Sequence, residues 1–278
     1  MKKLLLIPAI VLAAFFTSCS DDAESDMATS IIEQADLESE AALESNLEDV
    51  DVIVAAGMET IDVSGRLQDD EVIRCAAITH DEENNTLTID YGDGCEGPRG
   101  RVRAGKIIIT YDSRKLEPGS FRQATFEDFS VDGVLIEGTR RVENIAASLD
   151  ENPKFEVSLT GGKMTFEDGT AATRETSHTR EWVRATNPLE DETWIEGSAS
   201  GSRRDGASYS TVITERLVYS RACRGSRVFI PVSGVKEITF GDNVMVVDYG
   251  DGECDNIVTV TINGGEPFEK EITPRGRG

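Results

Sequence analysis

The residues of this chain whose type and spacing could do chemistry are its five cysteines: Cys19, Cys75, Cys95, Cys223 and Cys254. A cysteine thiol can be acylated, can ligate a metal or can be oxidised to a disulfide. Cys19 stands alone at the end of an apolar segment, whereas the other four are distributed along the body of the chain. We therefore treat Cys19 as a candidate for lipid attachment and the other four as candidates for disulfides.

An apolar leader precedes Cys19. Two lysines give it a positive start, and residues 4–16 form an apolar stretch shorter than the roughly 20 residues that span a bilayer. Two small residues then lead directly to the cysteine. The sequence predicts a lipoprotein signal peptide over residues 1–18 and a Cys19 that carries palmitate-type acyl chains; the alternative is a secreted protein with an unpaired Cys19. Two or more acyl chains anchor a protein stably without a transmembrane helix.

An internal repeat organises the other four cysteines. The sequence TIDYGDGC at residues 88–95 is echoed by VVDYGDGEC at residues 246–254. Three pairings of four cysteines are possible, and the repeat favours Cys75–Cys95 and Cys223–Cys254 because each pair then lies within one unit. This pairing leaves Cys19 unpaired, as a lipidated residue must be, and it predicts an oxidising compartment.

The chain is strongly acidic, with a formal net charge of −24. Such a charge disfavours nucleic acid and anionic membrane surfaces as partners. Residues 21–51 contain twelve acidic residues and no Lys or Arg. We interpret residues 19–51 as the lipidated N-terminus and a solvated spacer, with a short helix possible along Ile32, Ala35, Leu43 and Leu47. A partner-binding helix is the alternative.

The body, residues 52–278, has the pattern of a single antiparallel β domain. Apolar and β-branched residues alternate with polar residues in several segments, which is typical of half-buried strands; examples are 71–79, 86–91, 106–111, 155–160, 244–249 and 257–262. Turn signals separate them; we expect turns at 81–85, 132–133, 161–162, 168–169, 205–206 and 263–264. The sequence predicts an all-β, antiparallel meander or sandwich-like body with related N- and C-terminal hairpin units, and no long amphipathic helix within it.

The middle of the body, residues 162–219, is unusually polar. Residues 170–184 alternate Thr, Arg, Glu, Ser and His with hardly an apolar residue before Trp182. A strand buried on one face should have an apolar residue at every second position. We therefore expect this part of the sheet to be exposed on both faces or to form an edge; a loop is the alternative.

The two Asp-Tyr-Gly-Asp-Gly segments could place carboxylates around calcium, through Asp90, Asp93, Asp248 and Asp251. Their spacing does not fit the EF-hand pattern, and we prefer tight turns in which Gly supplies positive φ and Asp caps the backbone. His80 and His178 have no zinc-like spacing. The sequence predicts no catalytic residues, no enzyme activity and no cofactor beyond the calcium alternative.

Aromatic and basic residues offer weaker candidates. Trp182 and Trp194 could stack on sugar rings, although a role in the core is the interpretation we prefer. Four basic residues, Arg99, Arg101, Arg103 and Lys106, cluster after the first repeat. We expect them to pair with acidic neighbours on adjacent strands.

Three segments carry a resemblance to a family: residues 96–111, residues 134–142 with their Glu-Gly-Thr-Arg core, and residues 248–264. They resemble outer-membrane lipoproteins of the Bacteroidota whose function is unknown, as do Cys19 and the Ser-Asp-Asp sequence after it. The resemblance implies a β-rich, lipid-anchored, surface-exposed protein of the outer membrane. We expect a non-enzymatic binding or structural role, with an envelope protein or polysaccharide as partner. The alternatives are a carbohydrate-binding accessory protein of a glycan-uptake system and an envelope assembly factor.

Overall fold

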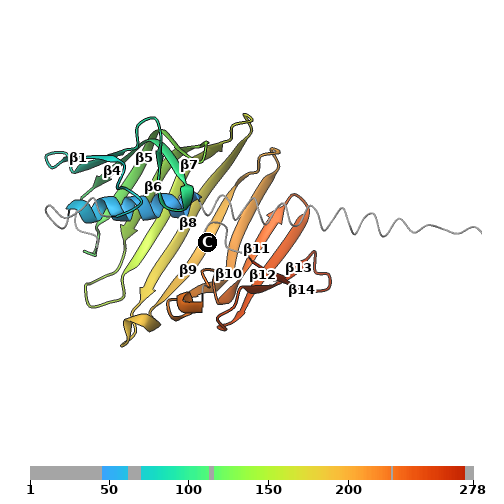
Figure 1. The fold of residues 1–278 in the computed structure, drawn as a ribbon. Coiled ribbons are helices and arrows are strands. Elements are labelled where there is room, and N and C mark those ends of the chain that lie inside the picture. Colours follow the sequence, from blue (N-terminus) through green and yellow to red (C-terminus); the bar gives the residue numbers. More distant parts are fainter. Residues whose placement is uncertain (1–45, 62–69, 113–115, 227, 273–278) are drawn as a thin grey trace, which may run out of the picture. The chain divides into compact units, whose positions relative to one another are not determined.

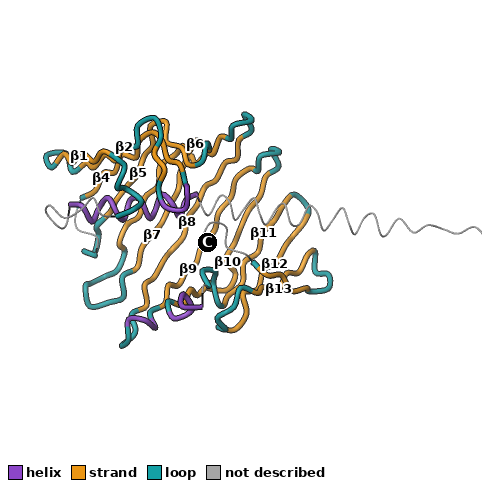
Figure 2. The backbone as a smooth tube through the Cα atoms, in the orientation of Figure 1, coloured by secondary structure: helices purple, strands orange, loops and turns teal. Residues whose placement is uncertain are grey.

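The structure, a computed structural model, describes residues 46–61, 70–112, 116–226 and 228–272. In these ranges a helix over residues 46–61 is followed by strands and short 3-10 helices (Figure 1 and Figure 2). The strands are β1 (Ala77–Asp81), β2 (Thr86–Asp90), β3 (Cys95–Glu96), β4 (Val102–Tyr111), β5 (Phe121–Val131), β6 (Val134–Asn144), β7 (Lys154–Thr165), β8 (Ala171–Val183), β9 (Glu192–Ser202), β10 (Ser208–Ser220), β11 (Ser233–Phe240), β12 (Asn243–Asp251), β13 (Ile257–Ile262) and β14 (Phe268–Glu271). The 3-10 helices are η1 (Pro98–Gly100), η2 (Pro188–Glu190) and η3 (Ala222–Ser226).

All fourteen strands belong to one antiparallel sheet. Its order follows the chain from β1 to β14, except that the short β3 pairs with β4 beside the main path. The sheet is open, with β1 and β14 as its edges. The predicted all-β meander is confirmed, and the described strands form a single sheet rather than the two packed sheets of a sandwich. A meander is the simplest outcome of this sequence because short turns join each strand to its antiparallel neighbour.

Most of the predicted turns are hairpins of this sheet. Asp132-Gly133 and Asn263-Gly264 have positive φ at both residues, as two-residue type I′ hairpins require. The prediction of a turn at Gly161-Gly162 is wrong, because both glycines lie inside β7. They mark a bulge there, since the β7–β8 register shifts between Leu159 and Gly162.

The predicted strand over 71–79 begins only at Ala77, because residues 71–75 form turns.

The helix over residues 46–61 belongs to the folded body. Its Leu47, Val50, Ile53 and Val54 follow helical spacing and are buried. The expected body boundary at residue 52 and the absence of a long amphipathic helix are therefore corrected, because one helix crosses that boundary and packs into the core. The prediction failed because acidic residues lie between the apolar ones in this segment and give it the composition of a solvated spacer. The other residues of the predicted helical stripe lie outside the described residues.

The helix lies across one face of the sheet, which we call the inner face (Figure 1). Its Gly57 approaches β2 so closely that an added Cβ would lie 2.5 Å from Ile89 Cδ1. Buried residues at every second strand position face the same side; they include Leu87, Ile89, Ile107, Ile109, Ile136, Val157 and Leu159. The opposite side, which we call the outer face, carries mainly polar and charged residues.

The polar strand of the middle is a central strand rather than an edge, a loop or a strand exposed on both faces. β8 pairs with β7 along one side and with β9 along the other. Its Ala172, Arg174 and Thr176 are buried on the inner face, with only 3% of Arg174 exposed. Arg174 donates from Nη1 to the Tyr209 hydroxyl at 3.1 Å and from Nε to Thr176 Oγ1 at 3.2 Å. The expectation failed because buried polar residues with hydrogen-bond partners can replace apolar ones on a core face.

Candidate functional site

The predicted disulfides join the segments that the repeat brings together. Cys75 pairs with Cys95 at a Cα–Cα distance of 6.2 Å, and Cys223 pairs with Cys254 at 5.0 Å. The first links the turns before β1 to β3, and the second links η3 to the loop after β12. Every cysteine of the described residues is therefore in a disulfide. Cys19, the predicted site of lipid attachment, lies outside the described residues.

The two Asp-Tyr-Gly-Asp-Gly segments share a local hydrogen bond but lie in different settings: the first forms a turn after β2, whereas residues 248–251 lie in β12, where its pairing with β11 is irregular. Asp90 Oδ1 accepts a hydrogen bond from Gly92 N at 2.8 Å, and Asp248 Oδ1 accepts one from Gly250 N at 2.9 Å. Gly92 and Gly250 both have positive φ, which glycine adopts without a Cβ penalty. In the part of the chain that the structure describes, no three His, Cys, Asp or Glu side chains form a group that could hold a metal ion. The geometry supports the turn interpretation at Asp90, but that interpretation is wrong for Asp248, which lies inside β12 at a break in its register with β11. Among the described residues, Asp93 and Asp251 belong to no group that could hold a metal ion.

The two tryptophans lie on opposite faces of the sheet. Trp194 of β9 pairs with Glu181 of β8, while the next residue of β8, Trp182, pairs with Thr193. Directly paired residues share a face and successive residues alternate, so the two indole rings cannot form one stacking platform. Trp182 belongs to the inner face and Trp194 to the outer face.

Each tryptophan has a different polar partner. Trp182 Nε1 donates to Asp191 Oδ2 at 2.9 Å, and Asp191 is almost fully buried. The hydrogen bond from Ala185 N, that from Trp182 and the charge of Arg221 together hold the pKa of Asp191 below its usual value. Trp194 Nε1 donates to Glu192 Oε2 at 2.7 Å, and the Arg216 guanidinium lies 4.1 Å from its ring centroid. Trp182 thus contributes to the packing at the C-terminal end of β8, whereas Trp194 belongs to a charged surface.

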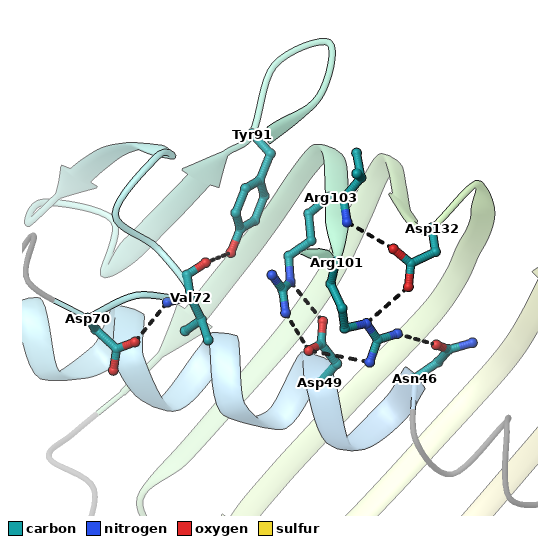
Figure 3. Close-up of polar contacts among 9 residues, drawn as sticks. Asn46, Asp49, Asp70, Val72, Tyr91, Arg101, Arg103 and Asp132 are labelled. Atoms are coloured by element: carbon teal, nitrogen blue, oxygen red, sulfur yellow. Dashed lines mark hydrogen bonds and ion pairs between the residues drawn. The ribbon is translucent and has the colours of Figure 1, made fainter. Parts of the chain in front are cut away.

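A charged contact between helix and sheet was not anticipated from the sequence. Arg103 of β4 donates to both carboxylate oxygens of Asp49 on the helix, at 2.9 Å and 2.6 Å (Figure 3). Arg101, which lies between η1 and β4, extends to Asp49 at 3.7 Å, to Asp132 at 3.2 Å and to Asn46 at 2.9 Å. Two arginines and two aspartates therefore form a balanced cluster at the start of the helix.

The contact between Arg103 and Asp49 is buried, so it determines the charge state of Arg103. Only 2% of Arg103 is exposed. Burial alone would lower the pKa of Arg103, but the hydrogen bonds and charge of Asp49 raise it, so the guanidinium stays protonated. The neighbouring Tyr91 donates its hydroxyl to Val72 O at 2.8 Å, and burial raises the pKa of that hydroxyl (Figure 3). A signal for this cluster was present in the sequence as the alternation of Arg101 and Arg103, but its acidic partner was assigned to a solvated spacer.

The prediction that the basic residues after the first repeat pair with acidic residues on adjacent strands is only partly confirmed. Lys106 pairs with Glu127 on the adjacent strand at 3.6 Å, as predicted. Arg103 instead pairs with the helix, and Arg101 pairs with both the helix and the β5–β6 turn. Nothing is described of the Arg99 side chain.

A second charged cluster lies farther along the same helix, around Asp51. Arg140 of β6 donates to both of its oxygens, at 3.1 Å and 2.9 Å, and Arg180 of β8 lies at 3.6 Å. Burial alone would raise the pKa of Asp51, but Arg140, Arg180 and Arg122 overcome it and hold the pKa below its usual value. Asp51 is therefore ionised at neutral pH.

The outer face offers a broad hydrophilic surface. On the central strands its exposed positions are hydroxyl and charged side chains; they include Glu137, Thr160, Lys163, Thr173, Glu175, Ser177, Glu196, Ser198 and Ser200. An apolar space between the helix and the sheet, lined by Leu47, Ile136, Leu159 and Met164 among others, holds no water-sized volume. The outer face is thus suited to contact with an extended polar partner.

Comparison of the chain with protein-family models, with curated protein sequences and with solved structures found no match. No helix in the described ranges is long and apolar enough to cross a membrane.

Proposed function

We propose that this protein is a lipoprotein of the outer membrane, anchored through Cys19, with a non-enzymatic binding or structural role in the cell envelope. The observation that carries the proposal is that four of the five cysteines are paired and Cys19 is left over. Cys75, Cys95, Cys223 and Cys254 are joined in two disulfides, and this supports an oxidising compartment outside the cytoplasm. Cys19 is left as the one thiol, directly after an apolar leader too short to span a bilayer.

The anchor is tested by metabolic labelling with palmitate in a bacterial host. Label should enter the wild type and be lost in Cys19→Ala, because only a thiol at the end of the leader can be acylated. Cys223→Ala is the matched control, since it also removes one cysteine and should retain the label. Equal labelling of wild type and Cys19→Ala would refute the anchor.

The binding or structural role rests on the outer face. Its central strands present hydroxyl and charged groups over neighbouring positions, and such groups can form hydrogen bonds with a protein or polysaccharide partner. Crosslinking in intact cells tests this role with Ser177→Arg and Ser198→Arg, two exposed residues that pair directly across β8 and β9. We expect these variants to lose the crosslinked partner. Asp242→Arg, in the exposed β11–β12 turn, should keep it, and an unchanged crosslink in the two serine variants would contradict the proposal.

Carbohydrate binding is a second candidate, favoured by the place of Trp194 on the hydroxyl-rich outer face. Aromatic rings beside hydrogen-bonding groups suit sugar recognition. Binding on a glycan array should then be lost in Trp194→Ala and retained in Trp182→Phe, because Trp182 lies on the opposite face. Loss in both or in neither would remove this candidate.

A further inference from the structure

The Asp51 cluster holds more positive than negative charge. Arg140 binds Asp51 at two points, and Nη2 of Arg180 lies 3.6 Å from Asp51 Oδ2. Both arginines extend from the inner face, one from β6 and one from β8. Asp51 is thus the shared counter-ion of two guanidinium groups.

A third arginine faces the same carboxylate. Arg122 of β5 pairs with Val142, and Ala124 pairs with Arg140, so Arg122 lies on the inner face diagonal to Arg140. Its charge interacts with Asp51 and is opposed by Arg140 and Arg180. Among the described residues, Arg122 has no hydrogen-bond or ion-pair partner. Burial, together with the two like charges, lowers its pKa.

The Asp49 cluster shows what a balanced arrangement on this helix looks like. There, Arg101 and Arg103 meet Asp49 and Asp132, and the charges cancel. Around Asp51, the guanidinium groups of Arg140 and Arg180 contact the carboxylate and Arg122 lies on the same face beside Arg140, so the cluster has an excess of two positive charges. The excess is notable because the whole chain has a net charge of −24.

The buried part of the Asp51 cluster also has an unused donor. Arg140 is 6% exposed, and its Nη1, like that of Arg103 in the Asp49 cluster, is buried without a hydrogen-bond partner in the structure. A buried charged donor without a partner is costly, so an acceptor at this point would be stabilising. The cluster is open to solvent on the side of Arg180, whose side chain is 40% exposed, while that of Asp51 is 18% exposed. A small anion can therefore approach the cluster from the side of Arg180, whereas Nη1 of Arg140 is itself buried.

We propose that Arg122, Arg140 and Arg180 form a binding site for a phosphate group beside Asp51. A phosphate monoester carries close to two negative charges at neutral pH, which matches the excess charge of the cluster. Guanidinium groups present paired donors that fit phosphate oxygens, and they remain protonated in partly buried sites. This site does not depend on the lipid anchor or on the outer face, and nothing in the proposed function assigns it.

The test measures inorganic phosphate binding to the mature chain, by calorimetry and by melting temperature, against chloride at equal ionic strength. At ten times the dissociation constant, we expect phosphate to raise the melting temperature by about 3–6 °C. Arg122→Gln should abolish this shift, because it removes the cation that has no protein partner while leaving the Asp51–Arg140 contact intact. Arg141→Gln is the matched control, since Arg141 is the next residue along β6, lies on the outer face and pairs with Glu143; it should leave the shift unchanged.

The outcomes separate the possible sources of the phosphate group. Vesicles of phosphatidylcholine with phosphatidic acid should capture the protein in an Arg122-dependent way if the group belongs to a lipid headgroup. Response to inorganic phosphate or glucose 6-phosphate without vesicle capture supports a soluble source. Absence of any phosphate-specific response, or an equal response in Arg122→Gln and wild type, overturns the proposal. If Arg122→Gln does not fold, Arg180→Gln takes its place, because Arg180 is the more exposed partner of Asp51.

Discussion

Arg103 on β4 and Asp49 on the helix are joined by two hydrogen bonds, with Nε–Oδ2 at 2.9 Å and Nη2–Oδ1 at 2.6 Å. This pair ties the N-terminal part of the helix to the sheet, and 54 positions of sequence separate the two residues. Since Arg103 is buried, its charge depends on Asp49 for compensation. The orientation of the helix on the sheet is thus specified by charge as well as by apolar packing.

Removal of the Asp49 charge should destabilise the protein strongly. Asp49→Asn leaves the Arg103 guanidinium buried without a counter-ion, and breaking a buried pair in this way costs about 3–5 kcal/mol. Urea unfolding followed by circular dichroism measures the free energy of unfolding. Glu137→Gln is the control, because Glu137 and Lys163 form an ion pair with both side chains 48% exposed, and such pairs contribute less than about 1 kcal/mol. Equal effects of the two substitutions would contradict the role given to the buried pair.

Acid should weaken the fold partly through Asp51. The pKa of Asp51 is lower in the folded state than its unfolded value of about 3.9. A group of this kind stabilises the folded state above the unfolded pKa, and that stabilisation is lost as the pH falls through the folded pKa. The free energy of unfolding should therefore fall below about pH 5, and it should fall less steeply in Asp51→Asn. Urea titrations at a series of acidic pH values measure this, and parallel curves for the two proteins would show that Asp51 does not contribute.

Loss of either disulfide should lower stability by a similar amount. The pairs close loops with sequence separations of 20 and 31, for which chain entropy predicts about 3–4 kcal/mol each. Cys75→Ser with Cys95→Ser, and separately Cys223→Ser with Cys254→Ser, remove each bridge without leaving a free thiol. Non-reducing peptide mapping of the wild type should recover only the two links described, and a Cys75–Cys223 peptide would be inconsistent with the structure.

The two tryptophans should respond differently to the same substitution. Trp182→Phe removes a hydrogen bond to Asp191, a buried carboxylate, and should cost about 1–3 kcal/mol. Trp194→Phe removes a hydrogen bond to Glu192 near the surface, and its cost should be under about 1 kcal/mol. Thermal and urea unfolding of the two variants measure the difference. A larger loss of stability in Trp194→Phe would contradict the assignment of Trp182 to the buried structure and of Trp194 to the surface.

Much of the fold could be predicted from local patterns. The segment 257–262 matches β13 in both bounds, and the Asp132-Gly133 and Asn263-Gly264 signals are hairpin turns as expected. These predictions succeed because strand alternation and turn chemistry depend on neighbouring residues. The Gly161-Gly162 prediction failed because a glycine pair has the same signal whether it closes a hairpin or lies at a bulge inside a strand.

The candidate site was less predictable. The alternation of Arg174 and Thr176 was visible, but it gave no sign of burial, because a polar residue on a core face needs partners from distant strands. Similarly, Asp49 and Asp51 belong to an acidic segment with the composition of a solvated spacer. Only their contacts with Arg103 and Arg140 show them to be structural, and these contacts span 54 and 89 positions of sequence.

The sequence by itself determined the β class, the approximate positions of several strands, the repeat and its cysteine pairing, since each follows from short-range periodicity or from spacing along the chain. The tertiary structure alone decided the order of the strands in the sheet, which face of each strand is buried, that Trp182 and Trp194 lie on opposite faces, and that Arg140 and Arg180 both pair with Asp51. The physical reason is that burial and charge compensation depend on what lies across the sheet. Because the helix packs on the inner face, its Asp49 and Asp51 become the counter-ions of the buried Arg103 and Arg140.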